Sequence, residues 1–239
     1  MGFSFKRSCF FVVFFALFVT AFVPSAWAQA SLSPSIVTAV EDGSGKVFFF
    51  KGNKYIRFDI KADKADPDYP KPIGATNWPG LPWTDGINAA FNNGQGKIYF
   101  FKGDQFVRFD VKADKVDPDY PKPIDATNWP GLPWKGAIDA AFNNGQGKVF
   151  IFKGKEYVRY DINADKVDPD YPKPIDAANW PGLPWKEGIG SGFYAGEGKA
   201  YIFKGEEYVR YDIKADKVDP DYPKPVNNDN WSGIGALLK

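Results

Sequence analysis

Residues 148–161 read KVFIFKGKEYVRYD, and this stretch determines the fold class. Residues 148–153 are apolar on both faces, as expected for a strand that is enclosed by neighbouring sheets. Lys153-Gly154 predicts a tight hairpin turn, and residues 156–161 predict the antiparallel return strand. The basic unit of this sequence is therefore a hairpin of two largely buried strands.

This hairpin recurs with a step of 51 residues. Three markers keep the same step: the glycine that opens the unit, the arginine of the return strand and a tryptophan near its end. They lie at Gly45, Gly96, Gly147 and Gly198, at Arg57, Arg108, Arg159 and Arg210, and at Trp78, Trp129, Trp180 and Trp231. A period near 50 residues with strand-like content is typical of propeller blades. We predict an all-β fold, a four-bladed β-propeller, with repeats at about 33–83, 84–134, 135–185 and 186–239.

The rest of each unit adds shorter elements around the hairpin. Residues 138–142 (IDAAF) predict a short apolar strand that ends at the turn signal Asn143-Asn144-Gly145. Residues 168–174 (DPDYPKP) contain too many prolines for a central strand, so they predict a sheet edge or a loop. Residues 180–185 (WPGLPW) close the unit and lead to the next one.

The N-terminus has the pattern of an export signal. Lys6 and Arg7 precede an apolar run, and Ala26-Trp27-Ala28 matches the small residues at a signal-peptidase site. The alternative is an uncleaved membrane anchor, but the run is shorter than the roughly 20 residues that a span needs. We predict a signal peptide at 1–28, a mature domain at 29–239 and secretion.

Removal of the signal leaves a nearly neutral chain without cysteine. Of 30 basic and 29 acidic residues, Lys6 and Arg7 are lost, which gives a net charge of −1. This balance argues against nucleic acid as a partner and against a polybasic membrane surface. Cys9, the only cysteine, leaves with the signal, so the domain must be stable without a disulfide.

The compound motifs of each unit resemble the hemopexin repeat. The order IDAAF, KVFIFKGKEYVRYD, DPDYPKPI and WPGLP is similar to that family, and the resemblance covers the chain from about Ile36 onward. Kelch repeats fit less well, because no strand is followed by a Gly-Gly doublet. The family commonly joins the first and last blades by a disulfide, which this mature chain cannot form. We therefore expect the ring to close by packing of the terminal segments between blades 1 and 4.

The propeller tunnel is the best candidate site. The innermost strand of a blade has no strand partner on its inner edge, and residues two apart direct their carbonyls the same way. We predict two stacked rings of carbonyl oxygens, formed by Val37, Asn88, Asp139 and Gly190 and by Ala39, Ala90, Ala141 and Gly192. Such oxygen cages suit Ca²⁺ or Na⁺, and the resemblance implies ions in this tunnel. The alternative is a tunnel filled with water.

Three other ligand hypotheses are weaker. The composition argues against haem binding, because the sequence has no His and the mature chain has no Cys for axial ligation. The four DPDYP loops could be calcium loops, but they fit better as turns in which Asp caps local amides. The strand arginines, each followed two residues later by Asp59, Asp110, Asp161 or Asp212, fit a structural ion pair or stacking role better than ligand binding.

These observations favour a binding module over an enzyme. We expect a secreted scaffold that holds a tunnel cation and recognises an extracellular protein or a small ligand. One alternative is a storage protein similar to the hemopexin-fold seed albumins that bind polyamines. A hydrolase is less favoured, because almost every Asp recurs fourfold in loops and no His can act as a base. Asn230-Trp231-Ser232 forms a glycosylation sequon, whose central Trp predicts a packed position that is not used.

Overall fold

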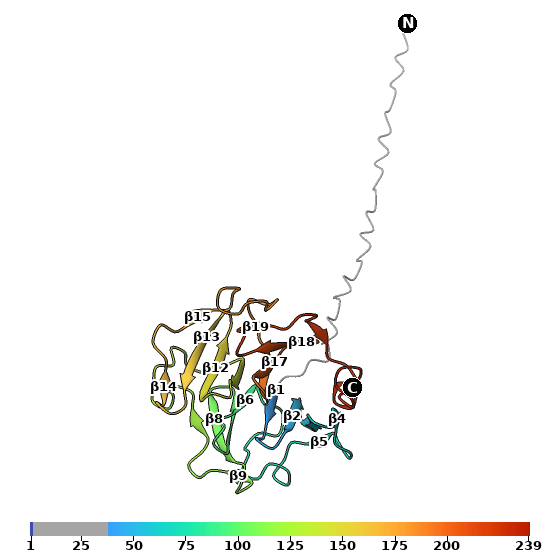
Figure 1. Cartoon of the computed structure of the whole chain (residues 1–239). Helices are drawn as coiled ribbons and strands as arrows, with labels where there is room; N and C mark the ends of the chain where they lie inside the picture. Colours follow the sequence, from blue (N-terminus) through green and yellow to red (C-terminus); the bar gives the residue numbers. More distant parts are fainter. Residues whose placement is uncertain (2–37) are drawn as a thin grey trace. The chain divides into compact units, whose positions relative to one another are not determined.

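The computed structural model describes Met1 and residues 38–239 and contains four antiparallel sheets of five strands each. The sheets follow one another around a central axis as the blades of a propeller (Figure 1). The predicted signal peptide at 1–28 and the candidate ligand Val37 lie outside the described residues. Among the residues that are described, no helix has the length and apolar character needed to cross a membrane.

Each blade has an innermost strand, a long hairpin and two short outer strands. Blade 1 contains β1 (Thr38–Glu41), β2 (Lys46–Lys51), β3 (Lys54–Asp59), β4 (Lys64–Ala65) and β5 (Lys71–Pro72). Blade 2 contains β6 (Ala89–Asn92), β7 (Lys97–Lys102), β8 (Gln105–Asp110), β9 (Lys115–Val116) and β10 (Lys122–Pro123). Blade 3 contains β11 (Ala140–Asn143), β12 (Lys148–Lys153), β13 (Glu156–Asp161), β14 (Lys166–Val167) and β15 (Lys173–Pro174). Blade 4 contains β16 (Ser191–Gly196), β17 (Lys199–Lys204), β18 (Glu207–Asp212), β19 (Lys217–Val218) and β20 (Lys224–Pro225), and the short helix α1 (Gly235–Leu238) follows.

The hairpin prediction is confirmed to the residue. β12 and β13 pair antiparallel from Lys148 opposite Asp161 to Lys153 opposite Glu156. The innermost strand differs: β11 begins at Ala140, two residues later than expected, and includes Asn143. The DPDYP segment is a loop between the two outer strands β14 and β15, each of which pairs with two residues of β13. Its prolines are compatible with that position, because an edge needs few backbone donors.

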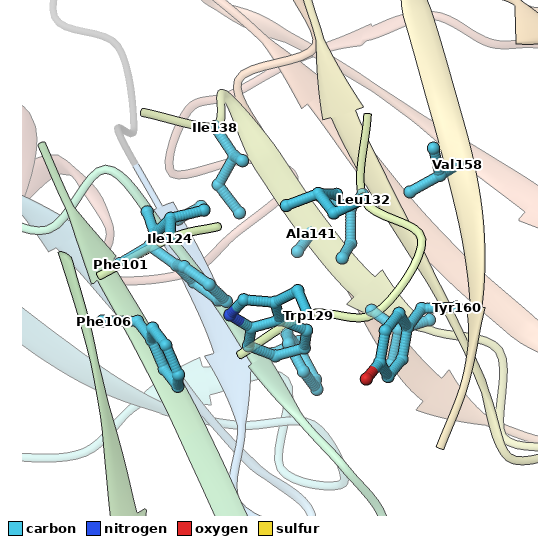
Figure 2. Close-up of a cluster of buried hydrophobic side chains, with 13 residues drawn as sticks. Phe101, Phe106, Ile124, Trp129, Leu132, Ile138, Ala141, Val158 and Tyr160 are labelled. Carbon is cyan, nitrogen blue, oxygen red and sulfur yellow. The ribbon is translucent and has the colours of Figure 1, made fainter. Parts of the chain in front are cut away.

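Tryptophan holds the centre of each interface between blades. Trp129 is nearly fully buried, and the rings of Phe101, Phe106 and the next blade's Tyr160 lie around it (Figure 2). Its ring centroid is 5.0 Å from that of Phe106 and 5.1 Å from that of Tyr160, both edge-to-face. The buried Nε1 atoms of Trp78, Trp129, Trp180 and Trp231 have no hydrogen-bond acceptor. In Figure 2 the nitrogen of Trp129 lies on the side of the Phe101 and Phe106 rings, whose π faces are weak acceptors for an N–H.

One backbone contact joins each blade to the next and closes the ring. The amides of Val116, Val167 and Val218 donate to the carbonyls of Pro79, Pro130 and Pro181 in the preceding blade. The fourth contact is the same bond between blades 4 and 1, from the Ala65 amide to the Ser232 carbonyl at 2.8 Å. The C-terminal segment therefore lies beside β4 (Figure 1). Lys51 Nζ also donates to the carbonyl of Leu238 at 2.9 Å, so closure by packing is confirmed for this end of the chain.

Candidate functional site

The innermost strands β1, β6, β11 and β16 stand side by side around the tunnel axis. The Ala39 amide of β1 donates to Ser191 Oγ of β16 at 2.6 Å instead of to β2. In an antiparallel strand the N–H and C=O of one residue point to the same side. The Ala39 carbonyl therefore faces away from β2, toward the tunnel, without a strand partner.

The predicted ring of Ala39, Ala90, Ala141 and Gly192 lies on these four strands, one residue per strand, and all four residues are buried. Small residues are required here because the strands of neighbouring blades approach closely. A Cβ atom on Gly192 would lie 2.6 Å from Cδ1 of Phe142 in blade 3. The ring is thus built from backbone groups, with no side chain that could replace them as ligands.

The other predicted ring precedes these strands, and its side chains have a different role. Asn88 Oδ1 accepts the Gly103 amide at 2.8 Å, and Asp139 Oδ2 accepts the Gly154 amide at 2.7 Å. Each side chain therefore caps the turn of its own blade's hairpin. Gly190 has no side chain, so only backbone carbonyls are available to an ion at this level. The carboxylate of Asp139 already accepts a hydrogen bond from the hairpin turn.

The opposite end of the inner strands carries a ring that the sequence reasoning missed. Glu41, Asn92, Asn143 and Tyr194 are related by the 51-residue step and line a cavity of about 10 Å³. Burial raises the pKa of the Glu41 carboxyl to about 7, while the Gly43 amide opposes that rise and the nearby Asp42 adds to it. The sequence did contain a sign of this ring: Glu41 stands at a repeat position where blades 2 and 3 have Asn92 and Asn143.

The strand arginines form ion pairs, but the expected partner was wrong. Arg159 Nε bonds to Asp168 Oδ2 at 2.5 Å, whereas Asp161 bonds to Lys148 Nζ at 2.6 Å. Lys148 also contacts Asp168 at 2.8 Å, so the first Asp of the DPDYP loop lies between two cations. The idea that this Asp caps local amides is therefore wrong. The guanidinium of Arg159 also lies 5.5 Å from the centre of the Tyr171 ring, which confirms the stacking role.

Grooves lie between neighbouring blades on the outer part of the molecule. Cavities of about 320, 200 and 360 Å³ separate blades 1 and 2, 2 and 3, and 3 and 4. Each is lined by the interface tryptophan, the strand arginine and an Asp from the next blade, such as Asp165 beside Arg108. These volumes are near the lower limit of about 300 Å³ for small-molecule sites.

Two further observations concern possible metal ligands and the sequon. Among residues 38–239 no group of three or more His, Cys, Asp or Glu side chains is placed to hold a metal. Asn230 Nδ2, the atom of the sequon that would carry a glycan, donates to the Pro225 carbonyl at 3.0 Å and to Asn227 Oδ1 at 3.2 Å.

Comparisons with known proteins agree with this architecture. The chain is 36% identical over 165 residues to stromelysin-1 of Equus caballus, which covers 68% of this chain and 33% of that protein. The chain thus spans about a third of that relative's length, and the similarity runs through the hemopexin repeats and not through a catalytic domain. The hemopexin-fold protein CP4 from cow pea has a TM-score of 0.72 at 28% identity, covering 84% of this chain and 97% of that one. A 2S albumin seed protein from Dolichos has a TM-score of 0.68 at 25% identity, covering 86% and 100%.

The family of this chain is assigned from its match to a model of the Hemopexin repeat. The Hemopexin model matches four consecutive segments, residues 36–82, 87–133, 138–184 and 192–235, one in each blade. With four matched repeats and four blades built on one plan, this chain belongs to the hemopexin family.

Proposed function

We propose that this protein is a secreted, non-catalytic binding module whose central tunnel holds a hard cation, Ca²⁺ or Na⁺. The observation that carries the proposal is the Ala39 amide, which bonds to Ser191 of blade 4 and not to its own sheet. Backbone oxygens at this level face the tunnel without strand partners, and an unpaired backbone group must be satisfied by water or an ion. Carbonyl oxygens are ligands that Ca²⁺ and Na⁺ accept readily.

Residues at two levels would supply the ligands of such an ion, and the hydrogen bond of the Ala39 amide supports the first of them. Ala39, Ala90, Ala141 and Gly192 would offer one carbonyl each, with small buried side chains that leave the axis free. Val37, Asn88, Asp139 and Gly190 would offer a second set. An ion between four blades would stabilise the closed ring, because it binds only when all four inner strands are in place.

For the partner, we propose an extracellular protein or a small ligand. The grooves between blades give polar, partly aromatic surfaces for such a ligand. The second candidate is a seed-albumin-like storage or polyamine-binding protein, which is favoured by the similarity to CP4 and to the Dolichos seed albumin. A haem-binding role is disfavoured because the whole chain lacks His.

Thermal unfolding with separate ligands tests the tunnel cation. The purified mature chain, stripped with a chelator, is melted with Ca²⁺, Na⁺, spermine or haemin added one at a time. We expect Ca²⁺ or Na⁺ to raise the Tm by several degrees, because ligand at 100 times its Kd adds about 2.7 kcal/mol to the folded state. No shift with either cation would overturn the tunnel site. A shift with spermine alone would favour the seed-albumin alternative, and a Soret change with haemin would contradict our view of haem.

A further inference from the structure

The ring at the far end of the inner strands joins blades through asparagine side chains. Asn92 Nδ2 of blade 2 donates to the Glu41 carbonyl of blade 1 at 3.2 Å, and Asn143 Nδ2 of blade 3 donates to the Asn92 carbonyl at 2.5 Å. These carbonyls face the axis, because their donors come from the neighbouring inner strand and not from the blade's own hairpin. We call these two bonds the asparagine clasps.

The asparagine clasps are missing on the other half of the ring. Blade 4 has Tyr194 and blade 1 has Glu41 at the equivalent positions, and neither side chain carries an N–H group. The Tyr194 hydroxyl instead accepts the Gly198 amide of its own blade at 3.0 Å. The carbonyls of Asn143 and Tyr194 therefore lack the side-chain donor that their equivalents in blades 1 and 2 have.

The Glu41 carboxylate lies next to this incomplete half. Glu41 Oε2 accepts the Gly43 amide at 2.5 Å, as Asn92 Oδ1 accepts Gly94 and Asn143 Oδ1 accepts Gly145. An asparagine would make this turn bond and also complete a clasp, so the turn does not explain the carboxylate. Glu41 forms no ion pair with any residue of the described region, 38–239.

The space at this end of the tunnel suits one small ion. Glu41, Asn143 and Tyr194 line the same cavity of about 10 Å³. Val40 and the three phenylalanines at the equivalent positions of the other blades also line it: Phe91, Phe142 and Phe193. That volume is about the size of one water or one ion. The half-buried Glu41 carboxyl group and the carbonyls of Asn143 and Tyr194 are hard oxygen donors around one space, which is the kind of ligand that Ca²⁺ prefers.

We propose that a hard cation of the size of Ca²⁺ binds at this end of the tunnel, to the Glu41 carboxylate and the carbonyls of Asn143 and Tyr194. This Glu41 site is separate from the backbone rings of the proposed tunnel ion. It replaces, between blades 3, 4 and 1, the cohesion that the asparagine clasps supply between blades 1, 2 and 3. The carboxylate is its only charged ligand, so one substitution removes the site without touching the backbone rings.

Calcium titration calorimetry and terbium luminescence test the Glu41 site. The chelator-stripped mature chain is titrated with Ca²⁺ and, separately, with Tb³⁺, which takes the same oxygen ligands and is excited through nearby aromatic rings such as Tyr194. The variants are E41Q, which removes only the charge, and E41N, which places in blade 1 the residue that blades 2 and 3 carry. Exposed Glu207→Gln is the control. We expect E41Q and E41N to bind one ion fewer than the wild type, or to bind it about tenfold or more weakly, and E207Q to bind as the wild type.

The result separates this proposal from the tunnel ion. Two ions in the wild type and one in E41Q support both sites, while one ion in the wild type and none in E41Q supports the Glu41 site alone. An unchanged number of ions and unchanged affinity in E41Q and E41N would overturn the Glu41 site, whatever the tunnel rings hold. Folding of the variants is checked by near-UV circular dichroism. E41N is expected to melt in chelator at or above the wild-type Tm, because its amide can complete a clasp to the Tyr194 carbonyl.

Discussion

At the scale of single residues, one ionic network is repeated in every blade. In blade 3 the Asp168 carboxylate lies between Lys148 and Arg159, and the same arrangement is centred on Asp66, Asp117 and Asp219 in the other blades. Burial opposes ionisation of Asp168, but hydrogen bonds from Lys148 and Arg159 outweigh it and hold its pKa below the ordinary 3.8. The network joins the proline-rich loop to the hairpin, so it fixes where the outer edge of the blade lies.

The variant D168N should lower the free energy of unfolding by about 1–2 kcal/mol at pH 7. This value is below that of a fully buried ion pair, because solvent screens the partly exposed side chains of Lys148 and Arg159. A depressed folded pKa gives stability that is present above the unfolded pKa of 3.8 and lost as the pH falls through the lower folded value. The difference between wild type and D168N should therefore shrink in acid. Urea unfolding at pH 7 and at pH 2 measures it. Asp170, exposed and with φ of 66°, gives the control D170N, and an equal D168N effect at both pH values would contradict the account.

At the scale of elements, the innermost strands combine close packing with open backbone groups. Their residues alternate between the two faces of the blade: Ala90 and Val40 pack in the interface of blades 1 and 2, and Ala89 and Phe91 pack in that of blades 2 and 3. In the middle of the strand both faces are apolar, so the polar groups available there are the backbone groups of its inner edge. That edge is where the candidate cation sites lie.

The variant G192A tests how tightly these strands pack. Its Cβ would lie 2.6 Å from Phe142, which is 1% exposed and has little room to move, so we expect a loss of about 1–3 kcal/mol from overpacking. The reverse change in the neighbouring blade, A141G, should cost about 0.5–1 kcal/mol, because it removes one methyl group and loosens the backbone. Chemical denaturation of both variants gives the comparison. If G192A were as stable as the wild type, the inner strands of blades 3 and 4 could move apart enough to accommodate the added methyl group without loss of stability.

At the scale of the whole molecule, the ring closes without a covalent link. The cluster between blades 4 and 1 combines Phe49 of blade 1 with Trp231, Ile234 and Leu237 from the end of the chain. Its centre has the same geometry as in the other interfaces: Phe58 and Trp231 lie 5.3 Å apart edge-to-face, as Trp129 and Tyr160 do at 5.1 Å. The last interface thus differs from the other three mainly in that blades 4 and 1 are not consecutive in the sequence.

Ile234 and Leu132 occupy equivalent positions and provide a matched test of closure. Ile234 is fully buried and Leu132 is 5% exposed, so truncation to Ala should cost about 2–5 kcal/mol at each site. We expect I234A to lose more than L132A, because blades 2 and 3 are joined directly along the chain and blades 4 and 1 are held together only by packing and hydrogen bonds. Urea unfolding followed by Trp fluorescence measures both. A smaller loss in I234A than in L132A would show that closure does not rest on the C-terminal segment.

The sequence by itself determined the blades. The 51-residue step, the hairpin at 148–161 and the tryptophan at the end of each unit are local or strictly periodic signals, so they predicted four sheets, the long strands and the buried rings without further information.

Only the tertiary structure decided the partners. Arg159 pairs with an Asp nine residues away and not with the one two residues away, because the loop folds back over the strand. The Glu41 ring depends on which carbonyls face the axis and which neighbours can donate to them, across steps of 51 residues or more. Local periodicity fixes which face of a strand is apolar, but a site is defined by the directions of oxygen and nitrogen atoms from separate blades, and those meet only when the ring has closed.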